Sequence, residues 1–281
     1  MDRTSQSNGG VLVRVVRPQS TLQSYVTFFY FIDAREPLTD FLYPEWGNIR
    51  FALSGEWSVQ VSDDSSGAPQ SAVLFGPTDR RATVRTTGGK TFGFGLTPLG
   101  WSRLIDSKAG QMANRVVPVA NLLGVPGETL RTELAAESDP LTNVDRLETL
   151  LYALLDLRQP VSKDVLVADA ALRMRPTTVS EFAKNSGMSG RKLHRLCLRS
   201  FGFAPKRLLR LQRFMDTLGR IRTAVGEPVP AAVGSSYYDQ SHFYRDFRDF
   251  MAMTPTEYFN APRHLMAAAA AAQISRCDAF V

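Results

Sequence analysis

The chain has 281 residues, 44% hydrophobic and 21% charged, with a formal net charge of +6, which suits two domains that each bury a core. Its two cysteines, Cys197 and Cys277, exclude a disulfide framework and show no zinc-ligand spacing. No apolar run approaches the roughly 18 residues that a membrane helix needs, and residues 1–10 are polar, so we expect a soluble cytoplasmic protein without a signal peptide or membrane contact.

From Val11 to Leu99 the chain carries short runs rich in β-branched and aromatic residues, separated by turn residues. These runs predict about seven strands and therefore a small barrel or sandwich. Ser54 and Gly55 stand between two runs and predict a hairpin turn. The predicted strands are Val11–Val16, Tyr25–Ile32, Asn48–Leu53, Glu56–Val61, Val73–Phe75, Ala82–Thr86 and Thr91–Leu96.

Three helices are predicted next, over Leu99–Gly110, Pro126–Glu137 and Pro140–Arg158. The last has Asp139 as its N-cap and Pro140 at its first position. It also carries an apolar stripe, which either packs on the strands or serves a partner helix in a homodimer; both interpretations stay open. The stripe consists of Val144, Leu147, Leu150, Leu151, Leu154 and Leu155.

The front half shows no catalytic pattern. It contains no Cys and no His, since all three histidines (His194, His242 and His264) lie in the back half, so a His-ligated metal is not expected there. A nucleophile elbow, a phosphate loop and a dinucleotide fingerprint are also absent from the sequence. We therefore expect no enzyme activity, metal or cofactor, although an all-carboxylate site stays open.

The front half is expected instead to bind something small or to dimerise. Several aromatic side chains are candidates for lining a pocket, although core packing explains each one more simply. They are Phe28, Phe29, Tyr30, Trp46, Phe51, Trp57, Phe92, Phe94 and Trp101. The sequence assigns no ligand-binding residue.

A domain boundary is predicted at Gln159–Ser162, followed by a first helix over Asp164–Met174. The charge changes at this point. Residues 1–160 hold 15 basic and 17 acidic residues, a net −2, whereas residues 161–281 hold 18 and 10, a net +8. This split predicts two domains with different partners.

Two short helices with a tight turn are predicted next. Thr178 and Glu181 form a capping-box pattern at the start of a helix over Val179–Asn185, which Gly187 ends. Ser189 can cap a second, basic helix. The inner face of this second helix is formed by Leu193, Leu196 and Phe201. Two short helices of this kind are typical of a helix-turn-helix.

The segment 177–223 is strongly basic, with 11 Lys and Arg residues against 2 acids, a net +9. A solvated helical surface is the plainer explanation of most charge runs. An imbalance this large, however, repels itself unless an anionic partner neutralises it, and a phosphate backbone does so through counterion release. The segment therefore predicts double-stranded DNA as the partner.

A second unit follows. Asp239 is a good N-cap for a helix with three phenylalanines on one face, and Thr254, Pro255 and Glu257 open a last helix. Together the two units resemble the DNA-binding domain of the AraC/XylS family of transcription regulators, over about 100 residues. The matching motifs are Gly187-Met-Ser-x-x-x-Leu-x-Arg195, Phe201-Gly-x-x-Pro205, Asp239-Gln-Ser-His-Phe-x-Arg-x-Phe247 and Thr254-Pro-x-x-Tyr258.

The resemblance implies an α+β protein: an N-terminal β-barrel or sandwich sensor domain with flanking helices over residues 1–160, and an all-α domain with two helix-turn-helix units over residues 161–281. It implies a sequence-specific regulator controlled by a small-molecule effector. If the regulator activates transcription, it would also contact RNA polymerase. The competing class, an enzyme or small-molecule carrier barrel fused to a nucleic-acid-binding tail, stays open.

Residue roles also come from the resemblance. Arginines of the first recognition helix suit guanine edges, and Gln240 suits adenine. For Arg207 and Arg210 the plainer alternative is helix solubility, and His194 is either a DNA contact or a solvated helix residue. The implied DNA contacts are Arg191, His194, Arg195 and Arg199 in the first unit, Arg213 on the connecting helix Pro205–Arg220, and Gln240, Ser241, Tyr244 and Arg245 in the second unit.

The second unit departs from the family pattern. Its predicted leading helix, Val229–Ser235, contains Pro230 and Gly234, Ala231 replaces the usual Ile or Leu, and Ser236 replaces the usual turn glycine. Residues 224–281 hold 4 basic and 6 acidic groups, a net −2. We therefore expect the first unit to supply most of the DNA affinity.

Overall fold

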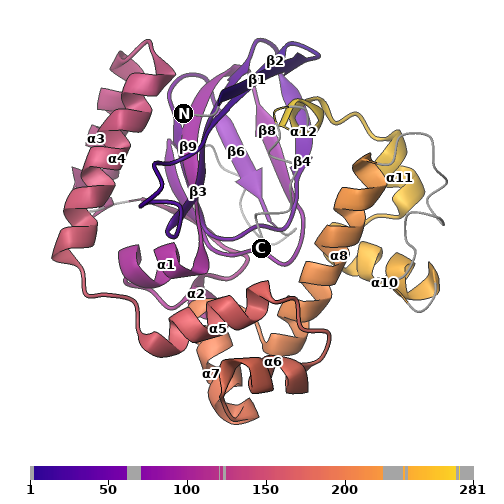
Figure 1. Cartoon of the computed structure of the whole chain (residues 1–281). Helices are drawn as coiled ribbons and strands as arrows, with labels where there is room; N and C mark the ends of the chain where they lie inside the picture. Colours follow the sequence, from indigo (N-terminus) through magenta and orange to yellow (C-terminus); the bar gives the residue numbers. More distant parts are fainter. Residues whose placement is uncertain are drawn as a thin grey trace.

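The computed structural model of the chain describes residues 3–61, 71–119, 121–122, 125–223, 237, 240–269 and 272. The described N-terminal part is an open antiparallel sandwich with helices on one side, and the described C-terminal part is helical (Figure 1). The α+β class predicted from the sequence is confirmed, and the two sheets form a sandwich rather than a closed barrel.

The larger sheet has seven strands in the order β1-β2-β3-β9-β5-β7-β10, and the smaller sheet has the order β4-β8-β6. A short ribbon, β11 with β12, stands apart. The larger sheet consists of β1 (Arg3–Asn8), β2 (Val11–Val16), β3 (Val26–Ala34), β9 (Gly89–Leu96), β5 (Asn48–Ala52), β7 (Ala72–Phe75) and β10 (Val116–Pro118). The other strands are β4 (Leu38–Leu42), β8 (Ala82–Thr86), β6 (Trp57–Gln60), β11 (Asn121–Leu122) and β12 (Val125–Pro126).

The hairpin predicted at Ser54 and Gly55 is wrong. β5 pairs with β7 and β9, whereas β6 pairs with β8 in the other sheet, so the chain changes sheets at this turn. Gly55 has φ +69°, and a Cβ placed on it would lie 1.7 Å from the Gly88 carbonyl oxygen. Two glycine turns therefore pack against each other, and this contact directs β6 away from β5. The sequence also missed β1, whose residues are all polar, and the short strand β4, which contains Asp40.

In Figure 1, α3 and α4 lie along one side of the sandwich, and α1 and α2 lie at its lower end, next to α5 and α7. They are α1 (Pro98–Leu104), α2 (Ala109–Met112), α3 (Gly127–Ala136) and α4 (Pro140–Leu157). The helix predicted over Leu99–Gly110 is two helices, because Ile105 takes an extended conformation after α1. Asp139 caps α4 as predicted, accepting a hydrogen bond from the backbone N–H of Leu141 at 3.2 Å.

The apolar stripe of α4 packs on the larger sheet. Leu147 and Leu151 are fully buried and share a core with Phe29 and Phe94. Leu150 is half-buried, and the exposed side of α4 is mostly polar. Packing on the strands therefore accounts for the stripe without a partner helix. The homodimer remains an expectation.

Six described helices of the C-terminal part, α5 to α11, pack around a phenylalanine-rich core that includes Phe182, Phe214, Phe243 and Phe247, whereas α12 packs elsewhere. The leading helix predicted for the second unit, Val229–Ser235, lies outside the described residues. The described helices are α5 (Lys163–Arg173), α6 (Val179–Ser186), α7 (Gly190–Ser200), α8 (Pro205–Thr223), α10 (Gln240–Met251), α11 (Pro255–Asn260) and α12 (His264–Ala269).

The two parts share buried contacts. Trp46, from the loop before β5, belongs to the helical core, and its ring lies 6.2 Å from that of Phe201. In return α12 packs on the sandwich, where Leu265 is buried and the Asp40 carboxylate accepts a hydrogen bond from its backbone N–H at 2.8 Å. In the described part of the chain, no helix is long and apolar enough to cross a membrane.

Candidate nucleic-acid interface

The predicted turn between α6 and α7 is present, and the N-terminus of α6 differs slightly from the predicted capping box. Thr178 accepts a hydrogen bond from the N–H of Glu181 at 3.1 Å, as expected of an N-cap. The Glu181 carboxylate, however, accepts from the N–H of Thr177 at 2.8 Å rather than from Thr178. This bond and a second from the Thr177 hydroxyl lower the pKa of Glu181. Gly187 ends α6 with φ +62°, a conformation that glycine adopts without strain.

α7 begins at the predicted cap, because Ser189 accepts a hydrogen bond from the N–H of Lys192 at 3.3 Å. Its inner face is anchored by Leu193 and Cys197, both fully buried. Burial raises the pKa of the Cys197 thiol to about 12, so this cysteine is an unreactive core residue. Cys277 lies outside the described residues. The buried face fixes which side of α7 turns outward.

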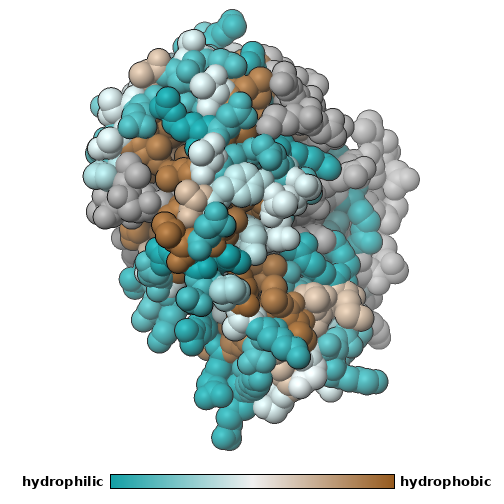
Figure 2. All heavy atoms as spheres, turned by 60° about the vertical axis from the view of Figure 1, so that its left-hand side comes forward, coloured by the Kyte–Doolittle hydropathy of each residue, from teal (hydrophilic) through white to brown (hydrophobic). Residues whose placement is uncertain are grey.

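The outward face of α7 carries Arg191, His194, Arg195 and Arg199, all exposed. The three arginines are spaced by four residues and therefore lie along one side of the helix. Within the described part of the chain, none of the three forms an ion pair, whereas Lys192 beside them contacts Asp164 at 2.8 Å. The lower end of the molecule, where Figure 1 places α6 and α7, is hydrophilic in Figure 2. α7 thus presents a row of unneutralised cations.

Arginines on α8 are in a different situation. Arg207 contacts Asp79, from the loop between β7 and β8, at 2.6 Å, and Arg210 contacts Asp249 of α10 at 2.9 Å. Arg213 contacts the buried Asp246 of α10 at 3.5 Å. Helix solubility, the plainer alternative for Arg207 and Arg210, does not describe them fully, because acids of two neighbouring elements pair with them. No sequence pattern marks this pairing, since its partners are distant along the chain.

The two acids of α10 lie away from its exposed side. Asp246 and Asp249 point to α8, so the net −2 counted from the sequence overstates the negative charge on the exposed side of α10. That side carries Ser241, Tyr244 and Arg245, all exposed. Asp239 and the Gln240 side chain, both singled out by the sequence, lie outside the described residues. The last helix opens as predicted, and Thr254 and Glu257 form a complete capping box at the start of α11.

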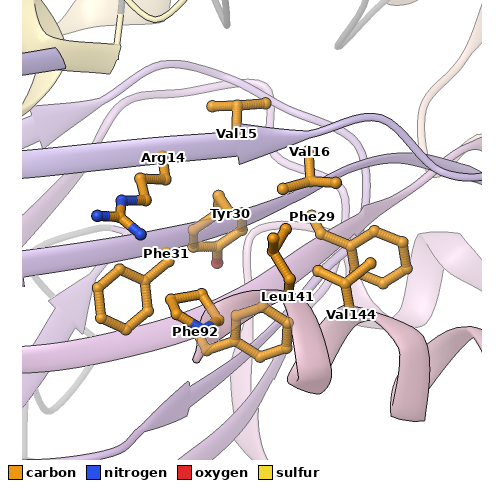
Figure 3. Close-up of a pocket in the computed structure, with 10 residues that line it drawn as sticks. Arg14, Val15, Val16, Phe29, Tyr30, Phe31, Phe92, Leu141 and Val144 are labelled. Carbon is orange, nitrogen blue, oxygen red and sulfur yellow. The ribbon is translucent and has the colours of Figure 1, made fainter. Parts of the chain in front are cut away.

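Most of the aromatic residues proposed for a pocket in the sandwich are core. Phe51 and Phe94 are fully buried, and Trp46 packs in the helical core instead. Three of the candidates, Phe29, Tyr30 and Phe92, do line a pocket, on the face of the larger sheet that α4 covers (Figure 3).

The sandwich interior holds a polar cluster that the sequence did not single out. Arg50 is buried and donates from Nε to the Tyr30 hydroxyl at 2.9 Å, and that hydroxyl donates to Asn48 at 2.7 Å. Burial raises the pKa of Tyr30. Loss of hydration raises the pKa of nearby Glu45 to about 7, against the lowering influence of Arg50. Within the described residues, no group of three or more His, Cys, Asp or Glu residues could hold a metal ion.

Comparison with family models concerns the helical part. Residues 182–261 match a family model described as a helix-turn-helix domain. No curated protein matches the chain.

Solved structures that resemble the chain include ToxT from Vibrio cholerae, at 10% identity and a TM-score of 0.48, covering 82% of this chain and 96% of ToxT. ToxT from strain SCE256 with a bound unsaturated fatty acid has 13% identity and a TM-score of 0.45, and the match covers 90% of this chain and 96% of ToxT. The AraC-like transcriptional activator CuxR has 13% identity and a TM-score of 0.33, and the match covers 73% of this chain and 80% of CuxR.

Proposed function

We propose that this chain, whose residues 182–261 are an AraC-type helix-turn-helix domain, is a transcription regulator that binds specific double-stranded DNA. The observation that carries the proposal is the outward face of α7. A capped helix of a helix-turn-helix presents three exposed arginines without an ion pair in the described part of the chain. Such a face suits both the phosphates and the base edges of a major groove.

The roles divide by position along α7. Arg191, His194 and Arg195 are nearest its N-terminus, the end that reads bases in helix-turn-helix complexes. An arginine there can bind guanine O6 and N7 with two hydrogen bonds. Arg199, near the C-terminus of the helix, contacts a phosphate.

In the second unit Gln240, Ser241, Tyr244 and Arg245 of α10 contact the next major groove, about one helical turn along the DNA. Arg213 of α8 contacts the phosphate backbone, although it shares its charge with Asp246. This unit binds DNA less tightly than the first, because the row of arginines on α7 forms no ion pair with the described residues.

The rest of the chain would regulate this activity. Residues 1–160 form a sensor domain for a small effector, and residues 161–281 form the DNA-binding domain. The protein acts in the cytoplasm without catalysis of its own. A homodimer and a contact with RNA polymerase fit the same proposal for a regulator that activates transcription.

The proposal is tested by selecting duplexes from a random pool with the full-length protein and then measuring affinity for the selected sequence. A regulator enriches one motif and binds it at least about 10³-fold more tightly than shuffled DNA at physiological salt. Arg146→Gln on the exposed side of α4 is the matched control and should leave binding unchanged. A protein that enriches no motif is not a sequence-specific regulator.

A further inference from the structure

We propose that a pocket between the larger sheet and the start of α4 binds a compact carboxylate, a small apolar body with a single anionic group. The inference rests on the proposed function, because a regulator with a sensor domain needs an effector, and it names the chemical class and the place. Figure 3 shows the pocket, with strands β2, β3 and β9 on one side and the first turn of α4 on the other.

The pocket has a volume of about 220 Å³ and a deeply buried apolar floor. Val16, Phe29 and Phe92 form the floor on the strands, and Val144 closes it from α4; each is at most 6% exposed. Leu141 and Phe31 are half-buried at the rim. An opening of this kind lets a ligand bury its apolar body while one end stays close to water.

Arg14 supplies the charge at the rim. Its guanidinium lies beside Phe31 at one end of the pocket in Figure 3. The side chain is exposed and has no hydrogen bond or ion pair with any residue of the described part of the chain. Asp33 is the nearest acid on the same face of β3, two residues beyond Phe31, the strand partner of Arg14. A carboxylate on the ligand would therefore meet a cation that no described residue neutralises.

The first two residues of α4 offer no free N–H to an anion. Pro140 has no N–H, and the N–H of Leu141 already donates to Asp139. Selectivity for an anion consequently depends on Arg14, which makes it testable with one substitution.

The volume sets the size of the apolar body. A dry apolar cavity of about 150 Å³ holds one benzene molecule, so the pocket accommodates a ring with a short side chain. A long alkyl chain would extend beyond the pocket. The first turn of α4 forms one wall of the pocket, and the C-terminal end of α4 precedes α5 of the helical part. A bound ligand would therefore contact the helix that connects the two parts.

The test uses the full-length protein and isothermal titration calorimetry. The probes are 3-phenylpropanoate, its neutral analogue 3-phenylpropanamide, and dodecanoate. We expect 3-phenylpropanoate to bind most tightly and Arg14→Gln to weaken it about tenfold, with less than a twofold effect on the amide. Arg17→Gln, which removes the same charge from an exposed position outside the pocket, should change neither.

Leu141→Phe provides a second, independent variant, because it fills the pocket from its half-buried rim and leaves the buried floor intact. It should abolish binding of both ring compounds while the thermal melting temperature stays close to that of the wild type. Equal binding of acid and amide, equal loss in Arg14→Gln and Arg17→Gln, tighter binding of dodecanoate, or no binding of the acid at millimolar concentration would each overturn the inference.

DNA affinity is measured on the same samples, which separates this inference from the proposed function. A protein that binds its selected DNA but not 3-phenylpropanoate overturns the carboxylate site alone. A protein that binds the probe in an Arg14-dependent way but has no preferred DNA supports the site and overturns the proposed function.

Discussion

At the scale of single residues, the arginines of the helical part fall into two groups that the sequence does not distinguish. Arg195 is exposed without an ion pair in the described part of the chain, whereas Arg213 shares the buried Asp246 with Arg210. The sequence identified the basic character of the segment correctly, because charge is a local property. It could not predict the pairing, because the acids that face α8 come from Asp79 and from α10.

Arg195→Ala should cost roughly 1–3 kcal/mol on the preferred site and relax its sequence preference, because a base contact is lost. Arg213→Ala should weaken all sequences more evenly. Asp246 keeps Arg210 and the Tyr237 hydroxyl as partners in that variant, so the fold should be retained. The measurement is a titration of both variants against single-base changes of the selected site. Equal and uniform losses would show that Arg195 contacts only phosphate.

Glu45 should make the stability of the folded protein depend on pH. Its folded pKa of about 7 lies above the ordinary value of 4.5, so the folded state binds more protons than the unfolded state between these pH values. Its contribution to stability is therefore present below about pH 4.5 and is lost as the pH rises to about 7. Glu45→Gln should stabilise the protein by about 1–3 kcal/mol at pH 8 and by much less at pH 5.

Chemical denaturation at the two pH values checks this, with the exposed Glu36→Gln as the control. A gain for Glu45→Gln that is the same at both pH values would contradict the assigned titration.

At the scale of elements, the sequence predicted most helices and strands but not which strands pair. Caps and turns such as Asp139, Gly187 and Ser189 act within a few residues, so the pattern reveals them. The partner of β5 depends instead on a contact between the turns at Gly55 and Gly88, which lie far apart in the sequence. The same reason explains why the pocket under α4 could not be assigned: its walls come from three strands and one helix.

The two DNA-binding units should differ in their electrostatic contribution. Replacing Arg191, Arg195 and Arg199 of α7 together with Gln should reduce the salt dependence of binding by about two to three units of log K against log salt if all three contact phosphate, and by less if Arg191 and Arg195 read bases. Replacing Arg245 and Arg248 of α10 should reduce it by at most about two.

Fluorescence anisotropy with one fixed duplex over a salt series measures both slopes. If the α10 pair flattens the slope more than the α7 triple, the first unit is not the main electrostatic anchor.

At the scale of the whole molecule, the domains predicted from the charge split are in close contact. Trp46 fills part of the helical core, and α12 packs on the sandwich. The sequence did not predict these contacts, because a single tryptophan in a loop and a short alanine-rich helix have no distinctive pattern. They suggest how a change in one part could reach the other.

The fragment 162–281 should fold and bind DNA, because the basic excess lies within it. Its melting temperature should be lower than that of the intact protein, since removing Trp46 opens a gap beside Phe201 and α12 loses its packing surface. Circular dichroism and DNA binding at low salt check the two parts of this prediction. A folded, helical fragment that retains no DNA would refute the placement of the binding surface.

The most direct test of the central claim is a competition titration of the full-length protein between its selected duplex and a shuffled duplex of equal length. The account predicts a preference of at least about 10³-fold at physiological salt. It also predicts that the α7 triple substitution removes this preference while the protein stays folded. An intact preference in the folded triple variant would show that α7 is not the reading helix and would contradict the account.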